Sequence, residues 1–293
     1  MPALAPTTIA LALSVVLPLV AQEHPAASGG HYSVVATVPP LADLARRLAG
    51  GDAEVTALIP PGVDDETYEP TARDLTELER AALILRVGHP AIGIEARVLE
   101  PFRQSHPRAR ILSLASVIEV STATDPHLWM SPRSMRAFAE SVRDALDAID
   151  PERREAHAAR LAALSRDIAE VDARLVDAGA ASAAFIVVHP AFGALARYGL
   201  KEEAIERDGK EPGMASLVAL VDRGRTEHVR LVVTQPGFPR RAAEVVAGEL
   251  GARVLSIDPL AADWLGSLRR LADALGDLRV AAAAATPPSG GGR

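Results

Sequence analysis

The chain has 293 residues, a formal net charge of −7, no cysteine, and 48% hydrophobic residues with few aromatics among them. The negative charge argues against nucleic acid or an anionic membrane as a partner, because neither would attract the protein electrostatically. The absence of cysteine excludes disulfides, thiolate metal ligands and the attachment site of a bacterial lipoprotein anchor.

The start of the chain predicts export. Residues 9–21 are almost wholly apolar but too short to span a bilayer comfortably, and Leu19-Val20-Ala21 has small residues at the spacing that signal peptidase reads. We expect a signal peptide over residues 1–21, a flexible mature N-terminus over 22–31, and a soluble periplasmic protein that is not lipidated. The mature length exceeds one ordinary hydrophobic core and predicts two domains.

Short β-branched runs alternate with longer amphipathic runs in the first half, as expected for parallel strands joined by crossover helices. Pro60-Pro61-Gly62 ends the second strand and begins a loop that carries an acidic cluster. The expected elements are strand 33–38, helix 39–47, strand 55–59, helix 74–80, strand 83–87, helix 92–104 and strand 110–114.

Residues 150–178 predict one long amphipathic helix. Asp150-Pro151 suits its N-cap and first position, Gly179 suits its end, and an apolar seam runs from Leu161 to Leu175. Such a helix would be about 42 Å long and could span two lobes as a stiff connector, which leaves little hinge motion. A coiled-coil dimer is the weaker alternative, because the seam lasts only about two heptads. We therefore expect a monomer.

The second half repeats the rhythm of the first. The expected elements are strand 184–188 followed by a helix after His189, helix 215–223, strand 229–234, helix 239–250, strand 253–257 and helix 261–275. The predicted fold is α/β, with two lobes that each contain a parallel sheet flanked by helices, joined by one long backbone helix. The predicted boundaries are an N-terminal lobe over 32–149, the connecting helix over 150–179, a C-terminal lobe over 180–278 and a disordered tail over 279–293.

Metal-ligating side chains stand in or beside turns in well-separated segments. The loop after Gly62 is acidic, His127 lies in Asp125-Pro126-His127-Leu128-Trp129, and His189 and Asp258 each follow a strand directly. The carboxyl ends of parallel strands face one crevice, so folding can bring such residues together. Imidazole and carboxylate donors without thiolate suit Zn²⁺, Mn²⁺ or Fe²⁺.

The chain resembles the zinc/manganese substrate-binding proteins of bacterial ABC transporters, in order from about Ser33 to Leu275. Members of this family hold one divalent metal in an interdomain cleft and deliver it to a membrane permease. The motifs that carry the resemblance are Val35-Ala36-Thr37-Val38-Pro39-Pro40-Leu41, Pro61-Gly62-Val63-Asp64 with Tyr68-Glu69-Pro70, Asp125-Pro126-His127-Leu128-Trp129, Asp150-Pro151, His189 with Ala191-Phe192-Gly193, Tyr198-Gly199-Leu200 and Asp258-Pro259-Leu260.

The resemblance implies four ligands, which fall on Glu66, His127, His189 and Asp258. Glu66 departs from the family, which usually has histidine at this position, and the neighbouring Asp64, Asp65 and Glu69 are open alternatives. Each residue also has a structural reading, as a turn histidine, a helix N-terminal histidine or a turn former. The extra carboxylate favours harder oxygen ligation, yet raw affinity keeps Zn²⁺ ahead of Mn²⁺ as the transported ion.

Two other functions stay open. One is an exported metal-dependent hydrolase with Glu66 as general base, although the sequence has no His-Glu-x-x-His, Gly-x-Ser-x-Gly or phosphate-binding glycine loop. The other is a two-lobed receptor for a chelate or haem, or an adhesin-like protein, and the few aromatics argue against haem. The remaining histidines are expected at the surface or in solvent; they are His24, His31, His89, His106, His157 and His228.

Overall fold

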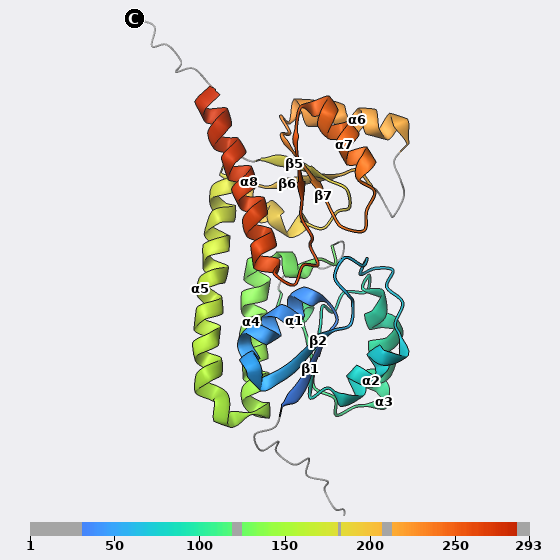
Figure 1. Cartoon of the computed structure of the whole chain (residues 1–293), viewed down its shortest axis with the longest axis vertical. Coiled ribbons are helices and arrows are strands. Elements are labelled where there is room, and N and C mark those ends of the chain that lie inside the picture. Colours follow the sequence, from blue (N-terminus) through green and yellow to red (C-terminus); the bar gives the residue numbers. More distant parts are fainter. Residues whose placement is uncertain (1–30, 119–124, 181–182, 207–212, 286–293) are drawn as a thin grey trace, which may run out of the picture.

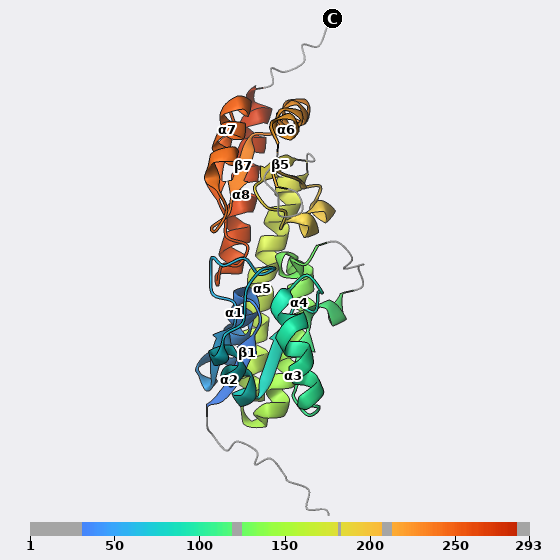
Figure 2. The ribbon, with the colours of Figure 1, turned by 90° about the vertical axis from the view of Figure 1, so that its right-hand side faces the viewer.

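The computed structural model describes residues 31–118, 125–180, 183–206 and 213–285, and it has two lobes that each contain a four-stranded parallel sheet. In Figure 1 the N-terminal lobe lies below the C-terminal lobe, and the turned view in Figure 2 shows the same stacking. The predicted fold class is confirmed. The predicted signal peptide and the last eight residues of the predicted tail lie outside the described residues.

The first sheet has the strand order β2-β1-β3-β4. Its strands are β1 (Tyr32–Ala36), β2 (Ala53–Ala57), β3 (Leu83–Arg86) and β4 (Ile111–Ser113), and its flanking helices are α1 (Pro39–Ala49), α2 (Ala72–Arg80) and α3 (Glu100–Ser105). Two prolines occupy the first positions of α1, where their fixed φ suits a helix start. Strand β2 lies on one side of β1, and the parallel strands β3 and β4 lie on the other side. Because the strand order switches between β1 and β3, the crevice expected for a ligand opens beyond the carboxyl ends of these two strands.

The second sheet repeats this pattern with the order β6-β5-β7-β8. Its elements are β5 (Ala184–Val187), β6 (Lys201–Ala204), α6 (Met214–Thr226), β7 (Leu231–Thr234), α7 (Arg240–Leu250) and β8 (Arg253–Ser256). A 3-10 helix over Gly193–Tyr198 stands where a helix was expected after His189. Strand β6 was not predicted, because its sequence Lys-Glu-Glu-Ala has the charged character of an edge strand.

Three long helices form one side of the molecule, and α5 joins the lobes; they are α4 (Pro132–Ile149), α5 (Arg154–Gly179) and α8 (Trp264–Ala285). Figure 1 shows α5 running along both lobes, with α4 beside its lower part and α8 beside its upper part. The apolar seam of α5 is buried against these helices, which excludes the coiled-coil alternative for this seam. One hydrophobic core runs through both lobes and the three helices, while a smaller one lies beneath α6 and α7.

Two features of these helices differ from the prediction. Helix α4 was not predicted, although Ser131 caps it through Ser134 N and Pro132 occupies its first position. Helix α8 continues to Ala285, ten residues past its predicted end, because the segment after Leu278 is rich in alanine, the best helix former. Within the described ranges, none of the helices has the length and apolar character needed to cross a membrane.

Candidate metal centre

Glu66 lies in the loop that follows β2. Gly62 begins this loop with φ at +76°, and the backbone N–H of Glu66 donates to Asp64 Oδ1 at 2.9 Å, which closes an Asx turn. At the far end of the loop, Thr71 and Asp74 form a capping box that starts α2. The Glu66 side chain is 38% exposed and points to the opposite lobe, where its Oε1 lies 3.9 Å from His189 Nε2.

His127 lies in the turn that precedes α4, and its side chain is 2% exposed. Asp125 Oδ1 accepts both the backbone N–H of His127 at 2.9 Å and the ring Nδ1–H at 2.8 Å. This contact places the proton of the neutral ring on Nδ1, so the lone pair of Nε2 faces the cleft. Trp129 follows on the same turn and donates from its indole to Pro259 O at 2.8 Å, which ties this turn to the C-terminal lobe.

His189 follows β5 directly and belongs to the C-terminal lobe. Gln235, at the end of β7, holds its backbone from both sides: its Oε1 accepts from His189 N at 2.8 Å, and its Nε2 donates to His189 O at 2.7 Å. Glu206, at the end of β6, lies 3.4 Å from the ring Nδ1. Phe238 stacks on the ring at 4.8 Å between centroids. These contacts leave Nε2 free to face Glu66.

Glu66, His127 and His189 converge: each offers one ligand atom, and these atoms lie within 4.8 Å of one another. We call these residues the three-donor group; it is the one such cluster in the described part of the chain. Two members come from the N-terminal lobe and one from the C-terminal lobe, so the group bridges the cleft. Their donor set of two imidazoles and a carboxylate suits a divalent transition metal, and the donor atoms would have to approach one another by up to about 1.5 Å to share one ion.

Asp65 lies near this group without being part of it, and Asp258 is not part of it either. Asp65 is 5% exposed, and its Oδ1 lies 3.9 Å from His127 Nε2. Asp258, the predicted fourth ligand, follows β8, but its Oδ1 accepts the backbone N–H of Leu260 at 2.9 Å. The structure therefore brings together three of the four residues that the resemblance implies and turns the fourth carboxylate to its own loop.

The electrostatics of the site reflect its burial. Burial raises the pKa of Asp65 and of Glu66, against the attraction of the two imidazoles. The pKa of His127 is raised in spite of burial, because its hydrogen bond to Asp125 and the charge of Asp65 favour the protonated ring. The same hydrogen bond lowers the pKa of Asp125, although burial opposes that change. Asp65, Glu66 and His127 therefore keep their protons to a higher pH than free side chains do, and a cation has to displace any proton that they hold.

Two histidines that were expected in solvent are buried. His157 on α5 is fully buried, and its Nδ1 lies 2.8 Å from Asp147 Oδ1 on α4. His89, after β3, is 7% exposed, and its Nδ1 accepts the backbone N–H of Ala91. Both surface predictions were wrong. His228 is exposed, as predicted, and His106 is partly exposed with its Nε2 3.1 Å from Glu79.

The residues that hold the side chains of the three-donor group in place were not recognised from sequence. Asp125 belongs to a recognised motif, so its hydrogen bond to His127 could have been expected from the two-residue spacing. Glu206 and Gln235 follow strands β6 and β7, a position that marks a residue at the crevice, but nothing in their local sequence indicates a contact with His189.

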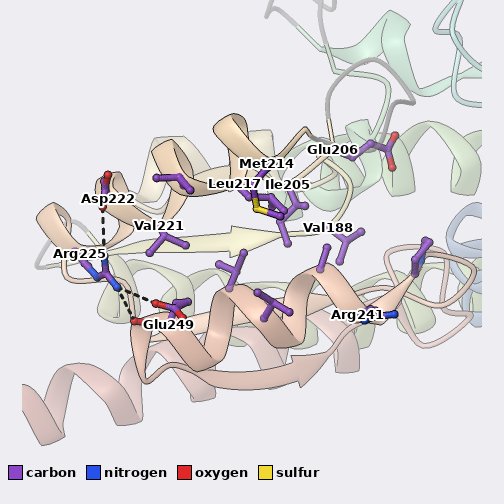
Figure 3. Close-up of a pocket in the computed structure, with 15 residues that line it drawn as sticks. Val188, Ile205, Glu206, Met214, Leu217, Val221, Asp222, Arg225, Arg241 and Glu249 are labelled. Carbon is purple, nitrogen blue, oxygen red and sulfur yellow. Dashed lines mark hydrogen bonds and ion pairs between the residues drawn. The ribbon is translucent and has the colours of Figure 1, made fainter.

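A separate apolar groove of about 690 Å³ lies between α6 and α7 in the C-terminal lobe. Figure 3 shows Met214 and Leu217 facing Val188 across it, with Arg225 paired to Asp222 and Glu249 at one end and Glu206 at the other. No member of the three-donor group lines the groove.

Comparisons with known proteins match this architecture. The family model for ZnuA, described as the periplasmic component A of a zinc-uptake complex, matches residues 34–277. The iron-binding protein YfeA of Yersinia pestis is 27% identical over 275 residues, which are 88% of this chain and 87% of that protein. The high-affinity zinc uptake system protein ZnuA of Bacillus subtilis is 24% identical over 254 residues, 79% of each chain.

A solved structure has the same fold. The crystal structure of a ZnuA superposes with a TM-score of 0.75 at 28% identity, and covers 84% of this chain and 98% of that one. The family consists of solute-binding proteins for metal transport, not of enzymes, so the hydrolase alternative is set aside. With a matching family model over most of its length, this chain belongs to the ZnuA family of periplasmic metal-binding components of ABC transporters.

Proposed function

We propose that the protein captures one divalent transition metal ion in the cleft between its lobes and delivers it to an ABC permease, with Zn²⁺ as the first candidate ion and Mn²⁺ as the second. The observation that carries this proposal is the convergence of Glu66, His127 and His189 from the two lobes. Neighbouring residues hold both imidazole rings and the backbone of Glu66 before any ion is bound, which reduces the cost of ordering the site. The resemblance implies Asp258 as a fourth ligand, but this carboxylate lies outside the group and accepts from Leu260 N.

The choice of ion follows from the donors. Nitrogen from two imidazoles suits Zn²⁺, and the Irving–Williams order places Zn²⁺ well above Mn²⁺ for such sites. The carboxylate of Glu66, at a position where the family usually has histidine, shifts the site toward harder ions. The names of relatives include both zinc and iron proteins, so the donor set and not the fold has to decide the ion.

Delivery requires a protein that works outside the inner membrane. The proposal therefore includes the predicted signal peptide over residues 1–21 and a soluble periplasmic protein without a lipid anchor, and it assumes a monomer. The continuous core through both lobes and the long helices supports a connector that limits lobe movement. Ion release would then need contact with the permease to separate Glu66 and His127 from His189.

The test begins with metal content and affinity. The protein is purified, stripped of metal and titrated with Zn²⁺ and Mn²⁺ against a competing chelator, beside His127→Ala and His189→Ala. We expect one ion per wild-type chain and strongly weakened binding in both variants. Metal-loaded protein, but not apo protein, should also stimulate ATP hydrolysis by its permease in proteoliposomes. A wild-type chain that retains no ion would refute the proposal.

A further inference from the structure

Asp65 differs from the other carboxylates of its loop. It is 5% exposed, and its Oδ2 is buried without a hydrogen-bond partner. The adjacent Asp64 is used in the turn that binds Glu66 N, and Glu69 has a 79% exposed side chain beside Arg97. Leaving a carboxylate oxygen buried and unpaired costs stability, so its position calls for a partner that the protein alone does not supply.

The other oxygen of Asp65 faces the three-donor group. Asp65 Oδ1 lies 3.9 Å from His127 Nε2, the same separation as that between Glu66 Oε1 and His189 Nε2. Two donors on one zinc ion, each at 2.0–2.1 Å and at a tetrahedral angle, are roughly 3.3 Å apart. Both pairs would therefore have to contract by about 0.6 Å onto a shared ion.

We propose that Asp65 is a direct metal ligand and completes a four-donor site with Glu66, His127 and His189. This inference rests on the proposed function. Two carboxylates cancel the charge of a dication while both imidazoles stay neutral, and four donors fill a tetrahedral shell. Asp258 keeps its hydrogen bond to Leu260 N in this arrangement. The N-terminal lobe then contributes three donors, and its loop supplies two of them from consecutive residues.

The second carboxylate makes the site harder than one built mainly from imidazoles. Oxygen donors favour Mn²⁺ and Fe²⁺ relative to a site rich in nitrogen, although Zn²⁺ still binds more tightly in absolute terms. Asp65 therefore narrows the preference for Zn²⁺ over Mn²⁺. Its removal should weaken binding of both ions and weaken Mn²⁺ binding more.

The test compares Asp65→Asn with the matched control Glu69→Gln, an acid-to-amide change in the same loop of the full chain. Each amide keeps the shape of the side chain it replaces, and the Glu69 side chain is 79% exposed beside Arg97, outside the three-donor group. Zn²⁺ and Mn²⁺ affinities are measured by chelator competition, and the melting temperature is measured on metal-free protein. Asp65→Asn should weaken Zn²⁺ binding by more than the about 10–100-fold typical of a residue that only supports a ligand. The control should bind both ions as the wild type does.

The melting temperature of the metal-free variant shows whether Asp65 is a ligand or a residue that stabilises the fold. A carboxylate that is needed only for the ion is a burden in the metal-free protein, so Asp65→Asn should leave the apo melting temperature unchanged or raise it. Loss of affinity together with a lower apo melting temperature would overturn the inference, as would unchanged affinity. Asp258→Asn is measured in parallel: if it alone weakens binding, the inference is wrong. If the wild type binds no ion, it is the proposed function that fails.

Discussion

Two buried histidines share one local arrangement but lie in different surroundings. His127 Nδ1 and His157 Nδ1 each lie 2.8 Å from a carboxylate oxygen, of Asp125 and Asp147 respectively. Beyond His127 Nε2 lie the Asp65 carboxylate and, with ring centroids 5.6 Å apart, the His189 ring of the other lobe. The Nε2 of His157 is buried without a partner, between α4 and α5.

The surroundings of the two histidines differ in the donors that face the free ring nitrogen. An aspartate can orient an imidazole and raise its basicity at either place, but only the turn before α4 faces donors from both lobes. The His157 pair instead joins the two helices of one hairpin and satisfies a buried carboxylate. We therefore assign His127 to ion binding and His157 to stability, and each assignment can be tested by the same substitution.

The largest effect is expected from alanine at these two positions. His127→Ala removes a ligand, so its Zn²⁺ affinity should fall by more than about 100-fold, beyond the range for supporting residues. His157→Ala removes a buried hydrogen bond while Asp147 keeps its contact with Arg143, so it should lower the free energy of unfolding by about 1–2 kcal/mol. Chelator competition and chemical denaturation of the apo proteins measure both. Equal losses of Zn²⁺ affinity in the two variants would contradict the assignment of His127 to ion binding and of His157 to stability.

A smaller effect is expected at Asp125. Asp125→Asn keeps an oxygen near His127 but loses the charge that raises the basicity of the ring, so Zn²⁺ affinity should fall by about 10–100-fold. The matching change Asp147→Asn alters the other pair and should leave affinity as it is. If Asp125→Asn bound Zn²⁺ like the wild type, the hydrogen bond would have no role in the site.

The sequence predicts an element well when burial shapes its pattern of apolar residues, and poorly when the element lies at an exposed edge. Strands such as β5 and β7 were found because their β-branched runs are buried on both faces, whereas β6 is charged and stands at an edge. His157 precedes Leu164 by two helical turns and so continues the apolar seam of α5. The prediction placed His157 away from this seam, whereas the spacing puts it on the buried face.

The candidate site was also predicted only in part. The resemblance places Glu66, His127 and His189 in order along the chain, and the strand ends explain why Glu66 and His189 face one crevice. It could not indicate that the Asp258 carboxylate turns to Leu260 N, because that choice depends on a local backbone contact. Nor could it separate Asp65 from the neighbouring acidic residues, since only folding buries one of them.

The pH dependence of binding sharpens the comparison further. The raised pKa of His127 means that its ring keeps a proton to a higher pH than an ordinary imidazole, and Zn²⁺ binds only the neutral ring. Affinity should therefore weaken by about tenfold per pH unit for each proton displaced, beginning above pH 6.5, the ordinary value for histidine. In Asp125→Asn the onset should move to lower pH. Titrations between pH 8 and pH 5 measure this, and a flat affinity would contradict it.

The smallest effect is expected in the apolar groove. Met214 is 76% exposed on α6 and lines the groove, away from the three-donor group. Met214→Ser should therefore leave Zn²⁺ affinity unchanged within error. A clear loss in this variant, measured by the same competition assay, would connect the groove to ion binding and favour a larger ligand such as a chelate.

The central claim is that residues of both lobes share one ion. Crystals of the zinc-loaded protein, measured at wavelengths on either side of the zinc absorption edge, would locate the ion directly. We predict one anomalous peak in the cleft, about 2.0–2.2 Å from the donor atoms of Glu66, His127 and His189. A peak bound to one lobe alone, or bound only outside the cleft, would contradict this account.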